Sequence, residues 1–377
     1  MTRRLSTGKA AILAILLLAD ALAGFGVYRY LGAHTGARLF QSQKPTDPGQ
    51  QHHSGPIAQL PGTLYLASEG AIYRLRRGDF SLVLPAGGWT QPAVTPNGQS
   101  LVVVKRQFAF SDLYLVSSNG QIQAQLTNDS SRSYEFNDWA FYPRLTPDGG
   151  TLFFDWDRPK DLQETYNVTL KVWSMPLGNP NAARRWTTPI AYTGGDVQPL
   201  PLSSTELIYT RYLRDQQGNV HSELWITSRP DLTGLLPGHA LTAPEDDCSQ
   251  AALAPDGRRL AMICTNGGQT ANLEVATFDG STLGPPQTLV AGMQAAEPTW
   301  APDGSGLVFL APGDIAGDFQ LFWERVPANL LPEVAAAAST SSTARTRPTP
   351  SPPSPPAPIQ LTTNLDFDAT SPIAWHA

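Results

Sequence analysis

The sequence predicts an all-β fold, a six-bladed β-propeller built from four-stranded blades. Three observations carry this prediction. A short motif with Pro-Asp-Gly recurs along the chain, and two further strand patterns recur at the same spacing. The two chain ends hold complementary parts of one more unit. Motifs that recur in this way are typical of an array of supersecondary units. Short strands joined by frequent turns are the pattern of a propeller.

The first recurring element is an opener, in which a few apolar residues meet a turn and a β-rich run comes after it. Pro and Asp-Gly favour such a turn, and two runs joined by it are typical of a β-hairpin. Four openers are complete, one has lost Asp-Gly, and the last is only the opening of a copy. Their marker residues are Pro92, Pro143, Pro199, Ala251, Pro298 and Pro372.

Two more strands come after each opener hairpin. One is apolar and aromatic, as at Leu113-Tyr114-Leu115 and Leu224-Trp225-Ile226. The other is shorter and ends near Leu-Thr, as at Leu126-Thr127 and Leu241-Thr242. Each unit therefore has four short strands joined by turns, which is the composition of a propeller blade.

The two chain ends together supply the sixth blade. Strands over residues 62–67, 71–75 and 80–84 have no opener before them, and the opener over residues 371–375 has no strands after it. We therefore predict that the last blade is closed by the N-terminal strands plus the C-terminal strand. This closure removes the sheet edges that an open array would expose to other chains.

The openers, written as Pro-x-x-x-Pro-Asp-Gly with a Leu-rich strand downstream, resemble the TolB-type repeat, also called the WD-like propeller repeat. The resemblance extends over about residues 62–377 apart from one insertion, and it implies a six-bladed TolB-like propeller. Related propellers occur in envelope scaffold proteins, as non-catalytic domains of prolyl-oligopeptidase-type peptidases and in some polysaccharide lyases. Ahead of the repeats this chain has a membrane-type segment and a polar linker where TolB has a separate α/β domain.

Residues 1–30 are predicted to be an N-terminal membrane anchor or signal segment. Three basic residues precede an apolar stretch over residues 10–27 that only Asp20 interrupts. Basic residues before such a stretch favour export of the rest of the chain. We expect a single-pass anchor in the cell membrane with the propeller on the extracytoplasmic side. If the chain is cleaved after Ala23, where Ala21-Leu22-Ala23 fits a cleavage pattern, the protein is secreted or periplasmic.

Two low-complexity segments complete the domain organisation. Residues 31–61 are rich in Gln, Pro, Gly, Ser and His and are predicted to be a flexible polar linker. The propeller is expected over residues 62–377, with a disordered Pro/Ser/Thr-rich insertion at 332–358 between the third and fourth strands of the fifth blade. The insertion is either a tolerated loop or one that binds a partner or carries sugars.

Composition and motifs argue against several functions. The net charge is −6 and the basic residues form no cluster, so the sequence lacks the basic surface that is typical of nucleic-acid binding. There is no Gly-x-Ser-x-Gly elbow, no His-Glu-x-x-His and no Gly-rich phosphate loop. None of the six His residues has a nucleophile or a metal ligand at a readable spacing. We therefore predict a monomeric protein that is no enzyme and has no catalytic residue, metal or cofactor.

One acidic pattern indicates a candidate binding site. Loops that enter the first strand of successive blades carry carboxylates, and equivalent loops of a propeller gather at one rim. The candidate acidic channel-mouth binding site is formed by Asp138, Asp196, Asp247, Glu297 and Asp368. Such a site would hold a cation or a basic partner segment. The alternative is that these loops are polar because they are loops.

The only two cysteines, Cys248 and Cys264, flank the Pro255-Asp256-Gly257 turn. Counting outward from this turn, residue 249 faces residue 264, so Cys248 lies within one residue of the position opposite Cys264. An even number of cysteines in an exported chain favours a disulfide. We predict this disulfide, and the alternative is two small buried thiols.

These features predict an extracytoplasmic, membrane-tethered, non-enzymatic β-propeller that acts as a protein- or peptide-binding scaffold of the cell envelope. The partner would be an envelope protein or peptide held by the rim loops and the channel mouth. The alternative is an enzyme or small-ligand sensor, for example for a carbohydrate, with its site in the central channel, because fold alone does not separate the two. The channel lining is expected to come from Val94, Leu145, Leu200, Leu253, Trp300 and Ala374 and their neighbours.

Overall fold

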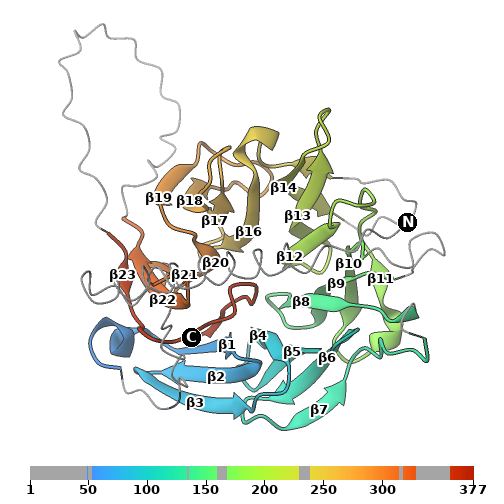
Figure 1. Cartoon of the computed structure of the whole chain (residues 1–377), viewed down its shortest axis with the longest axis horizontal. Coiled ribbons are helices and arrows are strands. Elements are labelled where there is room, and N and C mark those ends of the chain that lie inside the picture. Colours follow the sequence, from blue (N-terminus) through green and yellow to red (C-terminus); the bar gives the residue numbers. More distant parts are fainter. Residues whose placement is uncertain are drawn as a thin grey trace, which may run out of the picture. The chain divides into compact units, whose positions relative to one another are not determined.

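The computed structural model contains a ring of six four-stranded antiparallel sheets, the blades of a β-propeller (Figure 1). Helical structure among the described residues is limited to short 3-10 turns. The all-β, six-bladed fold that the sequence predicts is therefore confirmed. The structure describes residue 49 and residues 53–133, 136–158, 168–228, 238–313, 317–327 and 357–377.

Five blades are continuous in sequence, and each runs outward from a first strand that is the opener strand. The first two blades are β4 (Trp89–Val94), β5 (Ser100–Arg106), β6 (Ser111–Ser117) and β7 (Ile122–Gln125), then β8 (Ala140–Leu145), β9 (Thr151–Trp156), β10 (Lys171–Pro176) and β11 (Arg184–Arg185). The next two are β12 (Asp196–Ser203), β13 (Glu206–Arg214), β14 (Val220–Ser228) and β15 (His239–Ala240), then β16 (Cys248–Leu253), β17 (Arg259–Cys264), β18 (Asn272–Thr277) and β19 (Gln287–Val290). The fifth is β20 (Ala296–Trp300), β21 (Gly306–Pro312), β22 (Phe319–Arg325) and β23 (Ile359–Gln360).

The sixth blade joins the two ends of the repeat region, as predicted. Its strand order is β24 (Ala374–His376), β1 (Thr63–Ser68), β2 (Ala71–Arg76) and β3 (Asp79–Leu84). β24 pairs with β1 in antiparallel register, with Leu64 opposite Trp375 and Tyr65 opposite Ala374. Ile373 and Leu64, each 1 % exposed, belong to one buried cluster. Hydrogen bonding and core packing therefore both close the ring.

The opener turns are held by their own side chains. The Oδ1 atoms of Asp148, Asp256 and Asp303 each accept a hydrogen bond from the amide two residues later, at 3.0, 2.8 and 3.0 Å. The glycine of each turn has a positive φ, for example 72° at Gly149, a conformation that side chains disfavour. These carboxylates are accounted for by turn geometry.

The predicted disulfide between Cys248 and Cys264 is present. The pairing of β16 with β17 shifts between Ser249 and Ala252, and this β-bulge places Cys248 directly opposite Cys264. In a regular hairpin Cys248 would lie one residue away from the position opposite Cys264. The extra residue of the bulge corrects this offset.

The structured domain begins before residue 62. Residues 56–59 form the 3-10 turn η2 (Pro56–Gln59), and Ile57, 1 % exposed, packs in the cluster that contains Leu64. The predicted anchor over residues 1–30, most of the linker and nearly all of the insertion at 332–358 lie outside the described residues. No helix in the described part of the chain is long and apolar enough to cross a membrane.

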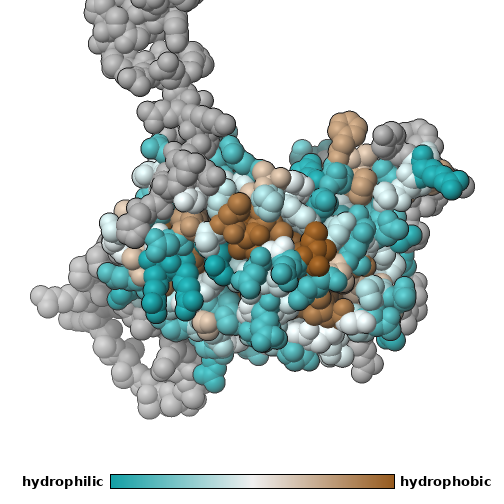
Figure 2. All heavy atoms as spheres, turned by 90° about the horizontal axis from the view of Figure 1, so that it is seen from below, coloured by the Kyte–Doolittle hydropathy of each residue, from teal (hydrophilic) through white to brown (hydrophobic). Residues whose placement is uncertain are grey.

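Most of the large apolar side chains that remain exposed lie on outer strands and in loops. Leu82 on β3 and Ile122 on β7 are 54 % and 56 % exposed. On the side of the molecule that Figure 2 shows, apolar side chains gather near the middle and polar ones surround them. Apolar groups on the surface are common in folded domains, and the central channel offers the more specific features.

Candidate functional site

The first strand of five blades carries the same irregularity, a β-bulge at the residue before the opener marker. Pairing registers shift at this place in each of the five blades. A bulge re-aims a side chain, and positive φ is uncommon for residues other than glycine. The residues with φ between 49° and 56° at these bulges are Gln91, Tyr142, Gln198, Gln250 and Glu297.

Hydrogen bonds run from one bulge to the bulge of the next blade. The Tyr142 amide donates to Gln91 Oε1 at 2.7 Å. The Gln250 amide donates to Gln198 Oε1 at 3.2 Å, and the Glu297 amide donates to Gln250 Oε1 at 2.7 Å. The bulge side chains therefore tie neighbouring blades together around the channel.

Two further bonds extend this arrangement. The Gln91 amide donates to the Ser371 hydroxyl at 2.9 Å, so the blade closed by β24 is joined to it. The Gln198 amide donates to Asp155 Oδ2 at 2.9 Å, and Asp155 lies on β9. At this bulge the acceptor is therefore a carboxylate from the second strand of the neighbouring blade and not a bulge side chain. We define the bulge ring as Gln91, Tyr142, Gln198, Gln250, Glu297 and Ser371.

The channel is nearly closed at the level of the bulge ring. Tyr142, Arg144, Gln198, Gln250 and Glu297 surround a cavity of about 10 Å³ there. This is about the room that one water molecule needs. The space between these residues is therefore too small for a ligand larger than water.

Glu297 and Arg144 set the electrostatics of this constriction. Burial raises the pKa of Glu297 to about 8, the charge of Arg144 lowers it, and Asp368 raises it further. The Glu297 side chain Oε1 has no hydrogen-bond partner among the described residues. Burial lowers the pKa of Arg144, against the attraction of Glu297 and Tyr142. At neutral pH Glu297 is therefore mostly protonated, while the guanidinium carries its charge.

We expect the folded domain to be more stable at about pH 5 than at about pH 8. Burial raises the pKa of Glu297 to about 8 and those of Asp129 and Asp196 to about 7. The stability that a raised pKa contributes is fully present below the unfolded value of about 4 and is lost as the pH rises through the folded value. Thermal unfolding should therefore move to lower temperature between about pH 5 and about pH 8.

The substitution Glu297→Gln should flatten this pH dependence, because it removes the carboxyl with the highest of these three pKa values. The matched control is Asp279→Asn. The amides of Thr282 and Ser281 lower the pKa of Asp279. The stability that Asp279 contributes is therefore lost only at a pH well below about 5. A Glu297→Gln variant with the slope of the unmodified protein would contradict the prediction.

A pocket of about 460 Å³ opens at the mouth of the channel on the side of the opener turns. Arg144 lines both this pocket and the small cavity of the bulge ring, so it lies between them. Every blade contributes a residue from its first strand, and these residues are Val94, Arg144, Leu200, Leu253, Trp300 and Trp375. We call this space the mouth pocket.

Four of the six expected lining residues are confirmed in the mouth pocket, and two are replaced by their neighbours. Leu145 packs into the buried cluster under β8 and β9, and Ala374 packs into the cluster under β24 and β4. Successive side chains of a strand point to opposite faces, so Arg144 and Trp375 face the pocket in their place.

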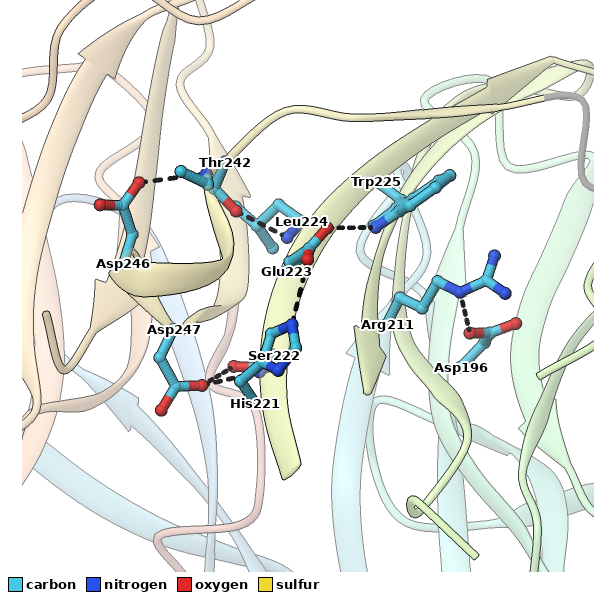
Figure 3. A network of polar contacts seen from close by, with 11 residues as sticks. Asp196, Arg211, His221, Ser222, Glu223, Leu224, Trp225, Thr242, Asp246 and Asp247 are labelled. Atoms are coloured by element: carbon cyan, nitrogen blue, oxygen red, sulfur yellow. Dashed lines mark hydrogen bonds and ion pairs between the residues drawn. The ribbon is translucent and has the colours of Figure 1, made fainter. Parts of the chain in front are cut away.

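The structure places the candidate acidic residues in contacts within and between blades. Asp138 Oδ2 forms an ion pair with Arg158 at 2.9 Å, and Asp196 lies 3.7 Å from Arg211. Asp196 is fully buried, and burial raises its pKa to about 7 although Arg211 lowers it. Figure 3 shows this pair beside Trp225, whose ring lies 4.8 Å from the Arg211 guanidinium.

Asp247 and Asp368 fasten neighbouring blades. Asp247 Oδ1 accepts bonds from the amide and the hydroxyl of Ser222, both at 2.7 Å (Figure 3). Asp368 Oδ2 accepts a bond from the Thr90 hydroxyl at 2.6 Å. Asp368 raises the pKa of Glu297, whereas Asp138, Asp196 and Asp247 lie in separate contacts. That the five residues act as one binding site stays a prediction.

The same region holds a polar network without a nucleophile. His221 Nε2 lies 3.1 Å from Glu223 Oε1, and the Trp225 indole donates to Glu223 Oε2 at 3.0 Å (Figure 3). The Ser222 hydroxyl donates to Asp247, which precedes the first strand of the next blade, and not to His221 or Glu223. In the described ranges, no three His, Cys, Asp or Glu side chains come together as metal ligands.

Sequence reasoning missed Arg144 and all of the bulge ring except Glu297, although a signal for each was present. The residue before each opener marker is polar in all six copies. The residue after the marker is small or apolar in four copies, is threonine in one, and is charged only at Arg144. The residues at this position are Ala93, Arg144, Leu200, Ala252, Thr299 and Ile373.

No model of a known protein family matches the chain, and no curated protein matches it. Among solved structures, TolB from Acinetobacter baumannii superposes with a TM-score of 0.51 at 16 % identity, over 72 % of this chain and 62 % of that one. The chain has a TolB-like propeller fold. It thus spans 62 % of the length of this TolB, so the likeness concerns the propeller fold alone.

Two other solved structures are similar to this TolB-like propeller at lower scores. A putative TolB from Agrobacterium tumefaciens has a TM-score of 0.49 and 15 % identity, over 71 % of this chain and 86 % of that one. A puromycin-hydrolysing peptidase from Mycobacterium tuberculosis has a TM-score of 0.44 and 14 % identity, over 74 % and 48 %. A shared fold does not by itself determine activity.

Proposed function

We propose that this TolB-like propeller is a non-enzymatic, membrane-tethered scaffold outside the cytoplasm that holds a protein or peptide segment of the cell envelope. The observation that carries the proposal is the mouth pocket of about 460 Å³, to which all six blades contribute. Pockets of this size are typical of specific ligand sites. Because its walls are strands of a closed ring, the pocket is preformed, and binding costs little ordering of the protein.

The constriction at the bulge ring supports binding rather than passage. A segment that enters the mouth pocket meets Arg144 and, beyond it, a space with room for about one water molecule. An extended end or loop of a partner is the kind of ligand that fits a pocket closed at its base.

The chain outside the described residues supports the location. An apolar stretch over residues 10–27 comes after three basic residues, as in an exported or anchored chain. The sequence predicts a polar linker between this stretch and the propeller, as a tethered domain requires. The Cys248–Cys264 disulfide fits an oxidising compartment outside the cytoplasm.

Affinity capture from the protein's own envelope tests the proposal. The tethered protein should retain a partner that is lost when Leu200→Trp fills the mouth pocket. The matched control is Ile122→Trp, the same type of change at an exposed residue of β7 far along the blade from the opener strand. A partner that both variants retain would place the site elsewhere than in the pocket.

Two further outcomes separate the alternatives. If Asp138→Asn, Asp247→Asn and Asp368→Asn together release the partner while Leu200→Trp does not, the acidic residues form the site. If no partner is captured while a soluble ligand such as an oligosaccharide raises the melting temperature, the protein is a small-ligand sensor or an enzyme.

A further inference from the structure

Arg144 is the distinctive residue of the mouth pocket. At the equivalent position of the other openers the side chains are uncharged, so Arg144 is the only charged side chain at this position of the six openers. No hydrogen bond or ion pair joins Arg144 to any other residue that the structure describes. Arg144 is half-buried and lines the open pocket, so a ligand there would replace the water around its guanidinium.

Glu297, the nearest candidate counter-ion, does not neutralise Arg144 at neutral pH. Glu297 is 4 % exposed and burial raises the pKa of its carboxyl to about 8, so the carboxyl is mostly uncharged. Glu297 and Arg144 do attract each other, yet they form no ion pair within bonding distance. The guanidinium is therefore available to an anion that arrives through the mouth pocket.

The walls of the mouth pocket define what else the ligand must carry. Val94, Leu200 and Leu253 are aliphatic, and Trp300 and Trp375 add aromatic faces. Both indoles are fixed, because Trp300 donates to the Ala252 carbonyl at 3.0 Å and Trp375 to the Pro61 carbonyl at 2.7 Å.

The side chains that line the mouth pocket are basic or uncharged, although the chain carries 32 Asp and Glu residues and a net charge of −6. The one negative group among the described lining residues is the terminal carboxylate of Ala377. An anionic ligand with an apolar body thus finds a cation at the base and apolar walls around it. A basic ligand would have to place its charge beside Arg144.

We propose that the mouth pocket binds the C-terminal carboxylate of a peptide whose last residues are apolar, with Arg144 as the residue that holds the carboxylate. A guanidinium matches a carboxylate with two parallel N–H···O bonds. The apolar side chains before the carboxylate would pack on Leu200, Leu253 and the two indoles. This assignment deepens the proposed function and rests on it, because it names the end of the partner that enters the pocket.

Fluorescence anisotropy with two peptide pools tests the assignment. Both pools consist of fluorescein-labelled apolar tetrapeptides, one with a free C-terminal carboxylate and the other with a C-terminal amide. The unmodified protein should bind the carboxylate pool about tenfold to a hundredfold more tightly, as expected for hydrogen bonds to a charged group. Arg144→Met should abolish this difference, and Arg144→Lys should keep part of it.

The outcomes separate this inference from the proposed function. Equal binding of both pools by the unmodified protein would overturn the carboxylate assignment and leave peptide binding in the pocket intact. Failure of both pools to bind would overturn the inference and count against the peptide-binding function as well. Displacement of the carboxylate pool by hexanoate as strongly as by unlabelled peptide would assign the site to small organic acids instead.

Two controls protect the test from loss of the fold. Arg144→Met removes a half-buried cation that has no ion-pair partner among the described residues, so its melting temperature should stay close to that of the unmodified protein. Arg158→Met, at an arginine outside the pocket that pairs with Asp138, should leave the preference for the carboxylate pool unchanged.

Discussion

A chain that ends at Thr370 is expected to lose the cooperative folding of the whole propeller. The truncation removes β24, whose pairing with β1 closes the ring, and it removes Ser371 from the bulge ring. It also removes Ile373, which is 1 % exposed, and opens a cavity in the cluster around Leu64. Loss of one such buried aliphatic side chain alone costs about 2–5 kcal/mol. The total stability of a domain is about 5–15 kcal/mol.

Circular dichroism during thermal unfolding measures this effect. We expect a broad transition at much lower temperature, or no folded state at all, for the chain that ends at Thr370. Addition of a synthetic peptide of residues 371–377 should restore part of the transition, because the peptide can pair with the exposed edge of β1. A truncated chain with an unchanged melting temperature would show that the ring does not depend on β24.

Reduction of the Cys248–Cys264 disulfide is expected to destabilise the domain by about 3 kcal/mol, the value for a loop of similar length. The bridge joins β16 to β17 across 16 residues of sequence. It restricts the unfolded chain, so its loss should lower the melting temperature without a change of fold. Denatured, unreduced protein should bind no thiol reagent, and reduced protein should bind two equivalents.

The double variant Cys248→Ala/Cys264→Ala separates loss of the bridge from other effects of the reductant. Its melting temperature should match that of the reduced protein and should not respond to dithiothreitol. If the oxidised and reduced proteins melt together, the disulfide contributes nothing to the free energy of unfolding.

Much of the fold could be predicted because its signals are local. The turn at Pro147-Asp148-Gly149 is held by bonds within a few residues, and a turn of this kind before an apolar run indicates a hairpin wherever it occurs. The closure of the sixth blade could also be predicted, since strands without an opener and an opener without strands leave one solution. The candidate site could be predicted only in part, because Val94, Leu200, Leu253 and Trp300 were expected in the channel while Arg144 was not.

By itself the sequence determined the number of blades, their strand order and the ring closure, because these depend on repeated local patterns. Only the tertiary structure decided which side chains face the channel. A β-bulge adds one residue to a strand, and a shift of one residue moves every later side chain to the other face. The bulges at Tyr142 and Gln250 are held by bonds from neighbouring blades, 51 and 52 residues away in sequence. Such bonds exist only once the ring has formed, and they turn Arg144 into the mouth pocket and bring Cys248 opposite Cys264.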